Sequence, residues 1–413
     1  MSSTAPRFTE WLDDVLVDYY GREPVSATFI GKHEYDHRLP DLSADGLDQA
    51  AAQTRGLLNR LAELPEESLS ESEQLDRDLA AGMLEIHAWE NEAGHMWRGN
   101  PSLTMGEAIF GVIALLLRPF APWPQREEAA VARLEAIPGL LDDTRVRLKY
   151  APAAWIARAV RECDGALLLF NSGLDRFAAD NGVNNQRLRR AGDRASAAVV
   201  EFRRFLTGEL KEGGSYGCGD EALSLMIRRG HWLPDDADTM LAFAEDRVRD
   251  LLAYLEAHAG DFGARTWQEA LAQLQNLHPS VNHYIARYEQ IWSECRETAI
   301  AANLVTWPDY PIRYVQQPRW AREAASNLYF LFYRAPATFD GLTPVEYLAP
   351  PNDASLPVEE QKRRLEATND SVIKLNHVVH HGGLGHHVQN YHAYRAASRI
   401  GQIAGVDCAS RIA

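Results

Sequence analysis

The feature that most constrains this chain is a stretch rich in both histidine and glycine, from His377 to His392. Six of the fourteen histidines of the 413-residue chain lie in it. Imidazole is the commonest protein ligand for metals and titrates near neutral pH, so this crowding indicates a metal or catalytic site. The alternative is a solvated, His-rich helix face. The glycines Gly382, Gly383 and Gly385 argue against it, because each costs a helix up to about 1 kcal/mol.

The spacing of these histidines leaves several pairings open. The segment from Leu365 to His381 lacks Gly and Pro, and its apolar pattern predicts a largely buried helix. In an unbroken helix, His377 and His381 share one face, and His380 and His387 share another. The glycine run can bend or widen the helix and so bring His380 and His386, six residues apart, onto one cation.

One family signature fits the same stretch. His380, Gly385, His386 and Gln389 take the positions of His, Gly, His and Gln in the pattern His-Glu-x-x-Pro-Gly-His-x-x-Gln. The stretch thereby resembles the metallopeptidase-like signature of the bacterial DUF885 family. Two positions depart from it, because His381 stands where the family has glutamate and Leu384 where it has proline.

The resemblance implies specific roles for the residues of this stretch. His380 and His386 would be metal ligands, with His387, the frequent extra histidine of the family, as the third ligand; His381 and His377 are the alternatives. The metal would be zinc, with iron or another divalent cation as the alternative. His381 would replace the missing glutamate as general base, since neutral imidazole accepts a proton near pH 7. From their proximity in the sequence alone, Tyr391 or Tyr394 would polarise a carbonyl or stabilise an oxyanion.

A second match to the family lies near the N-terminus. A polar loop between Pro24 and Ser43 is the favoured interpretation of that segment, and a substrate-contacting loop is the alternative. The polar residues concerned are His33, Tyr35, Asp36, His37 and Asp41. The family's N-terminal pattern is matched by Pro24, Ala27-Thr28, Gly31, Tyr35-Asp36 and Asp41-Leu42-Ser43.

The remaining chain predicts a mostly α fold, a single large multi-helix domain over residues 1–413, with the metal-motif helix at about 365–392. By resemblance the domain is similar to the helical zinc metallopeptidases. A few short strands are expected between Leu304 and Pro350, where aromatic and β-forming residues gather. The clearest helix is predicted from Asp235 to Ala259. Its expected buried stripe is Leu241, Ala244, Val248, Leu251, Leu252 and Leu255.

Charge and cysteine content narrow the partners and the location. A net charge of −16 argues against nucleic acid or anionic membrane as the main partner. Cys163, Cys218, Cys295 and Cys408 show no paired spacing, which predicts reduced thiols in the cytoplasm. The first twenty residues do not have the pattern of a secretory signal, and no apolar run is long enough to span a membrane.

The family also has a Glu-Gly-Trp motif after the metal helix that supplies a carboxylate ligand, and this sequence has none. We therefore expect a chain without the family's C-terminal portion. A partner chain or a homo-oligomer would complete the site, and an apolar surface would be exposed between Leu384 and Ile412.

Three functions follow as hypotheses. The first is a metal-dependent hydrolase of amide- or peptide-type bonds that acts on a small molecule or a peptide. The second is a non-catalytic metal-binding protein or subunit of a larger assembly, and the third is a non-haem iron enzyme.

Overall fold

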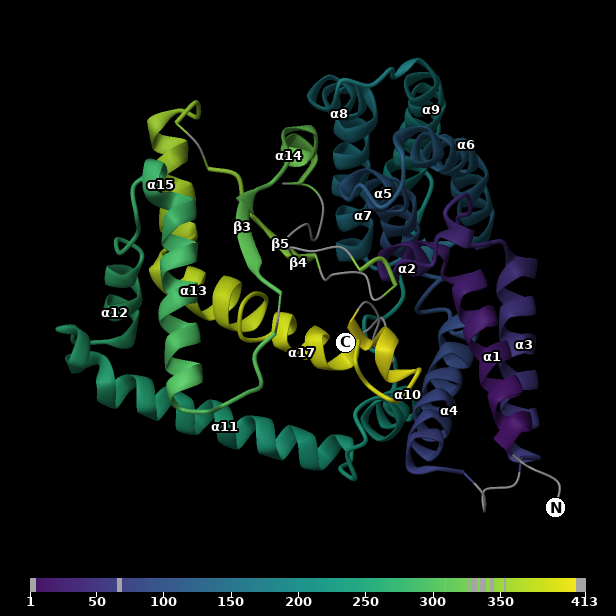
Figure 1. The fold of residues 1–413 in the computed structure, drawn as a ribbon, viewed down its shortest axis with the longest axis horizontal. Helices are drawn as coiled ribbons and strands as arrows, with labels where there is room; N and C mark the ends of the chain where they lie inside the picture. The colour runs from purple at the N-terminus through teal and green to yellow at the C-terminus, as the bar shows by residue number, and fades with distance from the viewer. Residues whose placement is uncertain are drawn as a thin grey trace.

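The computed structural model describes residues 5–64, 69–308, 310–325, 327, 333–334, 339–341, 345–352 and 354–405. The described chain is mostly helical with only short strands, which confirms the predicted fold class. An N-terminal bundle and a C-terminal group of helices around a small sheet lie side by side, and a long helix, α11 (Ala237–His258), runs along one edge between them (Figure 1). No helix in the described ranges combines the length and the apolar character needed to cross a bilayer.

The N-terminal bundle holds two apolar cores. The larger core forms around α5, whose residues are buried on nearly all sides, and the smaller one lies between α1, α3 and α4. The helices are α1 (Ala5–Arg22), α2 (Pro24–Ile30), α3 (Ala44–Ala62), α4 (Glu71–Glu92), α5 (Pro101–Leu117), α6 (Trp123–Arg147), α7 (Ala153–Leu168), α8 (Leu174–Asn181), α9 (Gln186–Gly208) and α10 (Asp220–Leu225). Shorter elements are η1 (His33–Tyr35), η2 (Leu169–Gly173), η3 (Met226–Gly230) and the paired strands β1 (Tyr150–Ala151) and β2 (Lys211–Glu212).

The C-terminal group is built around a three-stranded mixed sheet in the order β3-β5-β4. The strands are β3 (Ile312–Gln316), β4 (Tyr333–Arg334) and β5 (Val345–Ala349), so the prediction of short strands between Leu304 and Pro350 is confirmed. The surrounding elements are η4 (Ala259–Phe262), α12 (Trp267–Leu274), η5 (Val281–His283), α13 (Tyr284–Ala301), α14 (Arg319–Ala325), α15 (Val358–Ala367), α16 (Asp370–Val372), η6 (Ile373–His380), α17 (His386–Ala393) and η7 (Gly401–Gly405).

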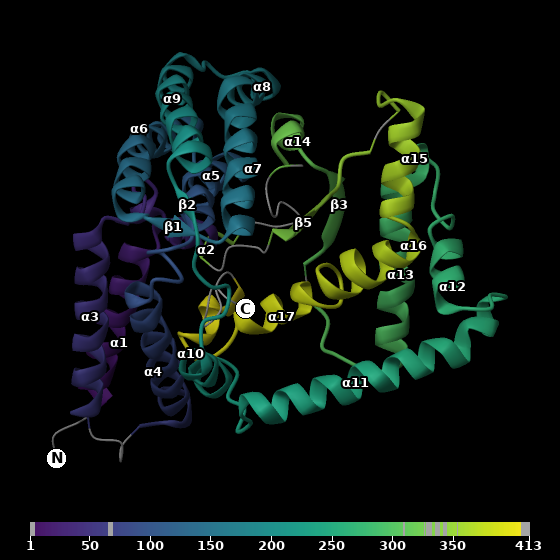
Figure 2. The same cartoon turned by 180° about the vertical axis from the view of Figure 1, so that it is seen from behind.

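After α17 the chain returns to the N-terminal bundle. The buried Asp76 of α4 accepts hydrogen bonds from Ser398 Oγ (2.6 Å) and from the backbone N–H groups of Arg399 (3.1 Å) and Ile400 (2.9 Å). Ile400 and Ile403, 6% and 3% exposed, join the smaller core. Helix α17 therefore bridges the two groups (Figure 2). The predicted exposed apolar surface from Leu384 onward is wrong for the described residues, and 406–412 lie outside them.

The exposed apolar surface lies instead on α11. Its bounds confirm the predicted helix, and Asp236 caps it by accepting a hydrogen bond from Thr239 N (2.9 Å). The expected buried stripe is wrong, because none of its residues is buried and Val248 and Leu251 are 57% and 60% exposed. The accessible area agrees with such an open arrangement. It is 20773 Å², against roughly 16,000 Å² for a compact monomer of this mass.

Replacing Leu252 of α11 by Gln should leave the free energy of unfolding within about 0.5 kcal/mol of the parent value, because no core contact is lost. Fluorescence of a hydrophobic dye bound to the native protein should fall. Leu251→Gln should have the same two effects. Leu134→Gln, in the larger core, should instead lower the free energy of unfolding severely. Destabilisation by 2 kcal/mol or more in the α11 variants would mean that this face is covered in solution.

Candidate metal centre

The histidine stretch folds as two helical pieces separated by a sharp break. The first piece, η6, is a π-helix that ends at His380, and the second, α17, begins at His386. The His381 N–H donates to Asn376 O (2.9 Å), five residues back, as a π-helix requires. Such wide turns are rare and occur often at functional sites. The predicted metal-motif helix at about 365–392 is therefore interrupted completely at the glycine run. It also begins at Asp370 and not at Leu365, because α15 ends at Ala367 and Asn369 caps a new helix.

Close approach by neighbouring atoms makes glycine necessary in the break. A Cβ at Gly385 would lie 1.7 Å from His380 O, and one at Gly383 would lie 1.9 Å from Trp292 Cδ1. Both separations are far below any van der Waals contact. The chain can therefore follow this path only because these two residues lack side chains.

The break brings His380, His381 and His386 together. One ring nitrogen from each of the three lies within 4.8 Å of the others. Ring centroids are 4.3 Å apart for His380 and His381, and 5.2 Å apart for His380 and His386. A tetrahedral zinc site needs donors about 3.4 Å apart at Zn–N distances near 2.1 Å, so small side-chain rotations would close the group around an ion. The sequence motif predicted His380 and His386 as ligands of one metal ion. In the structure the third member of the group is His381, one of the alternative third ligands.

Hydrogen bonding and burial prepare two of these imidazoles for metal binding. His386 Nδ1 donates to Gln389 Oε1 (2.7 Å), which fixes the ring and leaves Nε2 as the lone-pair nitrogen. Burial, together with the charges of His380 and His386, lowers the pKa of His381 to about 4. His381 is therefore neutral at pH 7, the state that a metal ligand or a general base requires.

The other proposed site residues lie apart from this group. His387 is fully buried and packs edge-to-face on Tyr310, with ring centroids 5.1 Å apart. Consecutive helical residues point about 100° apart, so His386 and His387 face different surroundings. The ring of Tyr391 packs at a tilt against that of Tyr310 (centroids 5.9 Å apart) and lies under the guanidinium of Arg395 (3.9 Å). Neither residue belongs to the group of three.

A buried tyrosine cluster supports the first helical piece. His377, the alternative ligand, points into it, and His377 Nδ1 shares a hydrogen bond of 2.5 Å with the Tyr347 hydroxyl. Burial lowers the pKa of His377 to about 4, so its ring is neutral at pH 7. The Tyr314 hydroxyl accepts from Gly383 N (3.4 Å), which joins strand β3 directly to the break.

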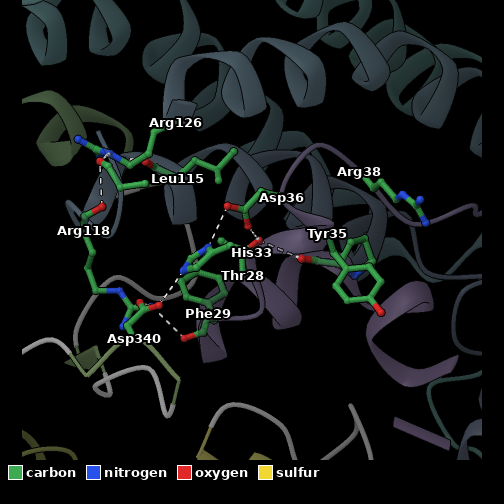
Figure 3. Close-up of polar contacts among 12 residues, drawn as sticks. Thr28, Phe29, His33, Tyr35, Asp36, Arg38, Leu115, Arg118, Arg126 and Asp340 are labelled. Carbon is green, nitrogen blue, oxygen red and sulfur yellow. Dashed lines mark hydrogen bonds and ion pairs between the residues drawn. The ribbon is translucent and has the colours of Figure 1, made fainter. Parts of the chain in front are cut away.

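A second polar cluster joins the N-terminal loop to a segment far along the chain (Figure 3). His33 Nδ1 bonds Asp36 Oδ2 (2.9 Å) and its Nε2 bonds Asp340 Oδ1 (2.6 Å). The ring also stacks on Phe120, with centroids 3.7 Å apart. Burial lowers the pKa of His33, but the two carboxylates outweigh it and the net result is a pKa of about 9.

Two arginines extend this cluster. The fully buried Arg133 donates to Thr28 Oγ1 (2.7 Å), which donates to Asp36 Oδ1 (2.6 Å). On the other side, Arg118 lies 3.7 Å from Asp340 Oδ2. The prediction of a polar surface loop is therefore inadequate for His33 and Asp36, which tie elements together. Asp340 carries no signal in the sequence that could have identified it as their partner.

Gly385→Ala should abolish the arrangement of the three histidines, because its Cβ cannot be accommodated beside His380 O. We expect metal affinity to fall at least about 100-fold, the upper end of what the loss of an outer-shell partner costs, measured by competition with a chromophoric chelator. Gly139→Ala is the matched control. Gly139 lies in α6 with no atom within 4 Å of a Cβ, so the protein should keep its affinity and gain about 0.5–1 kcal/mol of stability. Unchanged affinity in Gly385→Ala would contradict the geometry of the break.

The His33 cluster predicts a stability that depends on pH. Because its folded pKa, about 9, exceeds the unfolded value of about 6.5, His33 stabilises fully below pH 6.5. That stabilisation, about 1–3 kcal/mol, is lost as the pH rises to 9. The free energy of unfolding, measured in urea, should differ less between pH 6.5 and pH 9 in His33→Gln than in the parent protein. His258→Gln, which removes a surface pair with Asp261, should leave the difference unchanged.

Comparison with known proteins gives the family and the fold. No curated protein matches this chain at the required significance. A putative lipoprotein of unknown function from Shewanella oneidensis has a TM-score of 0.70 at 20% identity, over 96% of this chain and 74% of its own. A putative lipoprotein from Colwellia psychrerythraea has a TM-score of 0.71 at 13% identity, over 94% and 72%. The model of one family, bacterial protein of unknown function (DUF885), matches residues 24–408. The chain therefore belongs to the DUF885 family.

Proposed function

We propose that this protein is a metal-dependent hydrolase of amide- or peptide-type bonds, with zinc held by His380, His381 and His386. The observation that carries the proposal is the approach of three imidazole nitrogens to within 4.8 Å at a helix break. Three protein ligands with an open fourth position are typical of catalytic zinc, and an all-histidine set is sufficient.

Each residue of the group has a defined task in this proposal. Zinc bound there would supply Lewis acidity and would lower the pKa of a coordinated water to about 7. His386 would keep its orientation through Gln389. His381, neutral at pH 7, would serve as third ligand; in the competing role it would accept a proton as the base that replaces the family's glutamate.

A second candidate function is metal binding without catalysis. The described residues place no carboxylate in the histidine group, and His381 stands at the position of the family's glutamate. A non-haem iron site would require a carboxylate from elsewhere. The identity of the bound metal separates the iron alternative from the zinc proposal, and turnover separates the hydrolase from the binding protein.

The purified protein should contain close to one zinc per chain by elemental mass spectrometry. His380→Ala/His386→Ala should contain none, because two of its three ligands are lost. The matched control is His392→Ala, which removes an exposed imidazole of the same helix outside the group and should keep the metal. Gln389→Ala should bind zinc about 10- to 100-fold more weakly, as expected for loss of an orienting partner. Equal metal content in all variants would refute the site, and iron in place of zinc would favour oxygen chemistry.

His381→Ala distinguishes the two roles of His381 in the same preparations. Loss of zinc identifies a ligand, whereas retained zinc with loss of amide hydrolysis identifies a base. Hydrolysis of chromogenic amides and short peptides should cease with a chelator and return with added zinc. Turnover that persists after complete removal of metal would contradict the hydrolase proposal.

Location and partners remain predictions. The three cysteines in the described ranges, Cys163, Cys218 and Cys295, are free thiols, which supports the expected cytoplasmic location. The two structural relatives are described as putative lipoproteins, which supports an envelope location instead. Fractionation of cells that express the native gene decides between them. A homo-oligomer or a partner chain that supplies a carboxylate is the expected partner of the site.

A further inference from the structure

Helix α11 is exposed over its whole length, although much of it is apolar. None of its residues is buried. Both views show it along one edge of the molecule, with no other element on its outer side (Figures 1 and 2). Eight of its large apolar side chains are each 36–62% exposed, namely Met240, Leu241, Phe243, Val248, Leu251, Leu252, Tyr254 and Leu255. Exposed apolar clusters of this kind mark interaction surfaces.

The exposed apolar area of α11 is sufficient for a protein–protein interface. At roughly 150–200 Å² for each fully exposed large side chain, the eight together expose roughly 600–800 Å². Each partner of a standard stable interface buries about 800 Å². A second helix laid along α11 would therefore remove enough apolar surface from water for stable association.

The spacing of the apolar residues suits a second copy of the same helix. Five of them follow one another at intervals of three, four, three and four residues, and we call them the α11 seam: Leu241, Ala244, Val248, Leu251 and Leu255. This is the heptad spacing with which two helices pack side chains of one into gaps of the other. A seam with this repeat is complementary to itself, so two identical chains can pair through it.

The charged residues of α11 also favour a protein partner. In the middle of the helix Arg247 pairs with Asp250 and Arg249 with Asp246, and none of the four belongs to the α11 seam. Two copies can therefore meet along the seam without burying an unpaired charge. The helix carries five carboxylates and only two arginines. Together with the net charge of −16 for the chain, this opposes binding to an anionic bilayer.

We propose that α11 pairs with α11 of a second copy of this chain, which gives a dimer with two-fold symmetry. The helices run antiparallel, because a parallel pair would place two acidic first turns, with Asp236 and Asp238, side by side. Val248 of one copy then packs against Leu251 of the other on both sides of the axis, and the small Ala244 lies opposite the larger Leu255. The proposal does not depend on metal binding or hydrolysis.

Sedimentation velocity of the full chain, at protein concentrations from about 0.5 to about 200 µM, tests the proposal. We expect a monomer–dimer equilibrium with a dissociation constant in the micromolar range, the weak end of what an interface of this area gives. The effects predicted above for Leu252→Gln apply at the lowest concentration, where the monomer prevails and the face is open.

Val248→Glu should remain monomeric at the highest concentration, because the dimer would bury two carboxylates in the α11 seam. Val200→Glu is the matched control. Val200 lies on α9 and is 51% exposed, against 57% for Val248, so this variant should dimerise as the parent protein does.

A mixing experiment tests the antiparallel arrangement. Val248→Glu and Leu251→Lys should each be monomeric alone, because each would bury two like charges in the seam. Mixed in equal amounts they should form heterodimers, detected by native mass spectrometry, since the new carboxylate of one chain faces the new ammonium of the other. A parallel pair would place each residue opposite its own counterpart and would give no such heterodimer.

Three results would overturn the proposal. They are a parent protein that stays monomeric at the highest concentration, a Val248→Glu variant that dimerises like the parent, and mixed variants that stay apart. A monomeric parent that sediments with phosphatidylcholine vesicles would assign the face to a membrane instead of a second copy.

Discussion

The steric requirement for glycine between His380 and His386 is the constraint on which the candidate site depends. Carbonyl oxygen and indole atoms fill the space that side chains at Gly385 and Gly383 would need. The helix is therefore interrupted here, and His380 and His386, which a straight helix would send to different faces, have ring centroids 5.2 Å apart. The π-helix before the break also positions the histidines, since its wide turns place His377 inward and leave His380 exposed.

The break can hold its shape because both ends of the segment are anchored in different cores. On one side, Ile373 and Val378 pack with the tyrosines of α13, β3 and β5. On the other, Asp76 binds the chain just after α17, and Ile400 enters the smaller N-terminal core. A metal centre needs ligands held to a fraction of an ångström, and elements fixed at both ends provide this better than a free loop.

Local sequence patterns predicted much of this arrangement. The remainder depends on long-range packing, which such patterns do not show. The motif identified His380 and His386, because their spacing and the glycine belong to one short segment. It could not choose among His377, His381 and His387, since that choice depends on helix phase across the break. The apolar stripe of α11 was visible in the sequence, but periodicity cannot tell whether another element covers it. The pairing of His33 with Asp340 has no local signature, because the two residues come from distant segments.

The histidines themselves show why residue type alone does not settle chemistry. His33 lies between two carboxylates, and both ring nitrogens are hydrogen-bonded to them, so its imidazolium form is stabilised. His377, His381 and His387 are desolvated, and each has a pKa lowered to about 4. An imidazole is thus a structural cation at His33, and it is a neutral ring with a lone pair to donate at His377, His381 and His387. A neutral imidazole is the form that binds a metal ion, so its lowered pKa suits His381 to the role of a metal ligand.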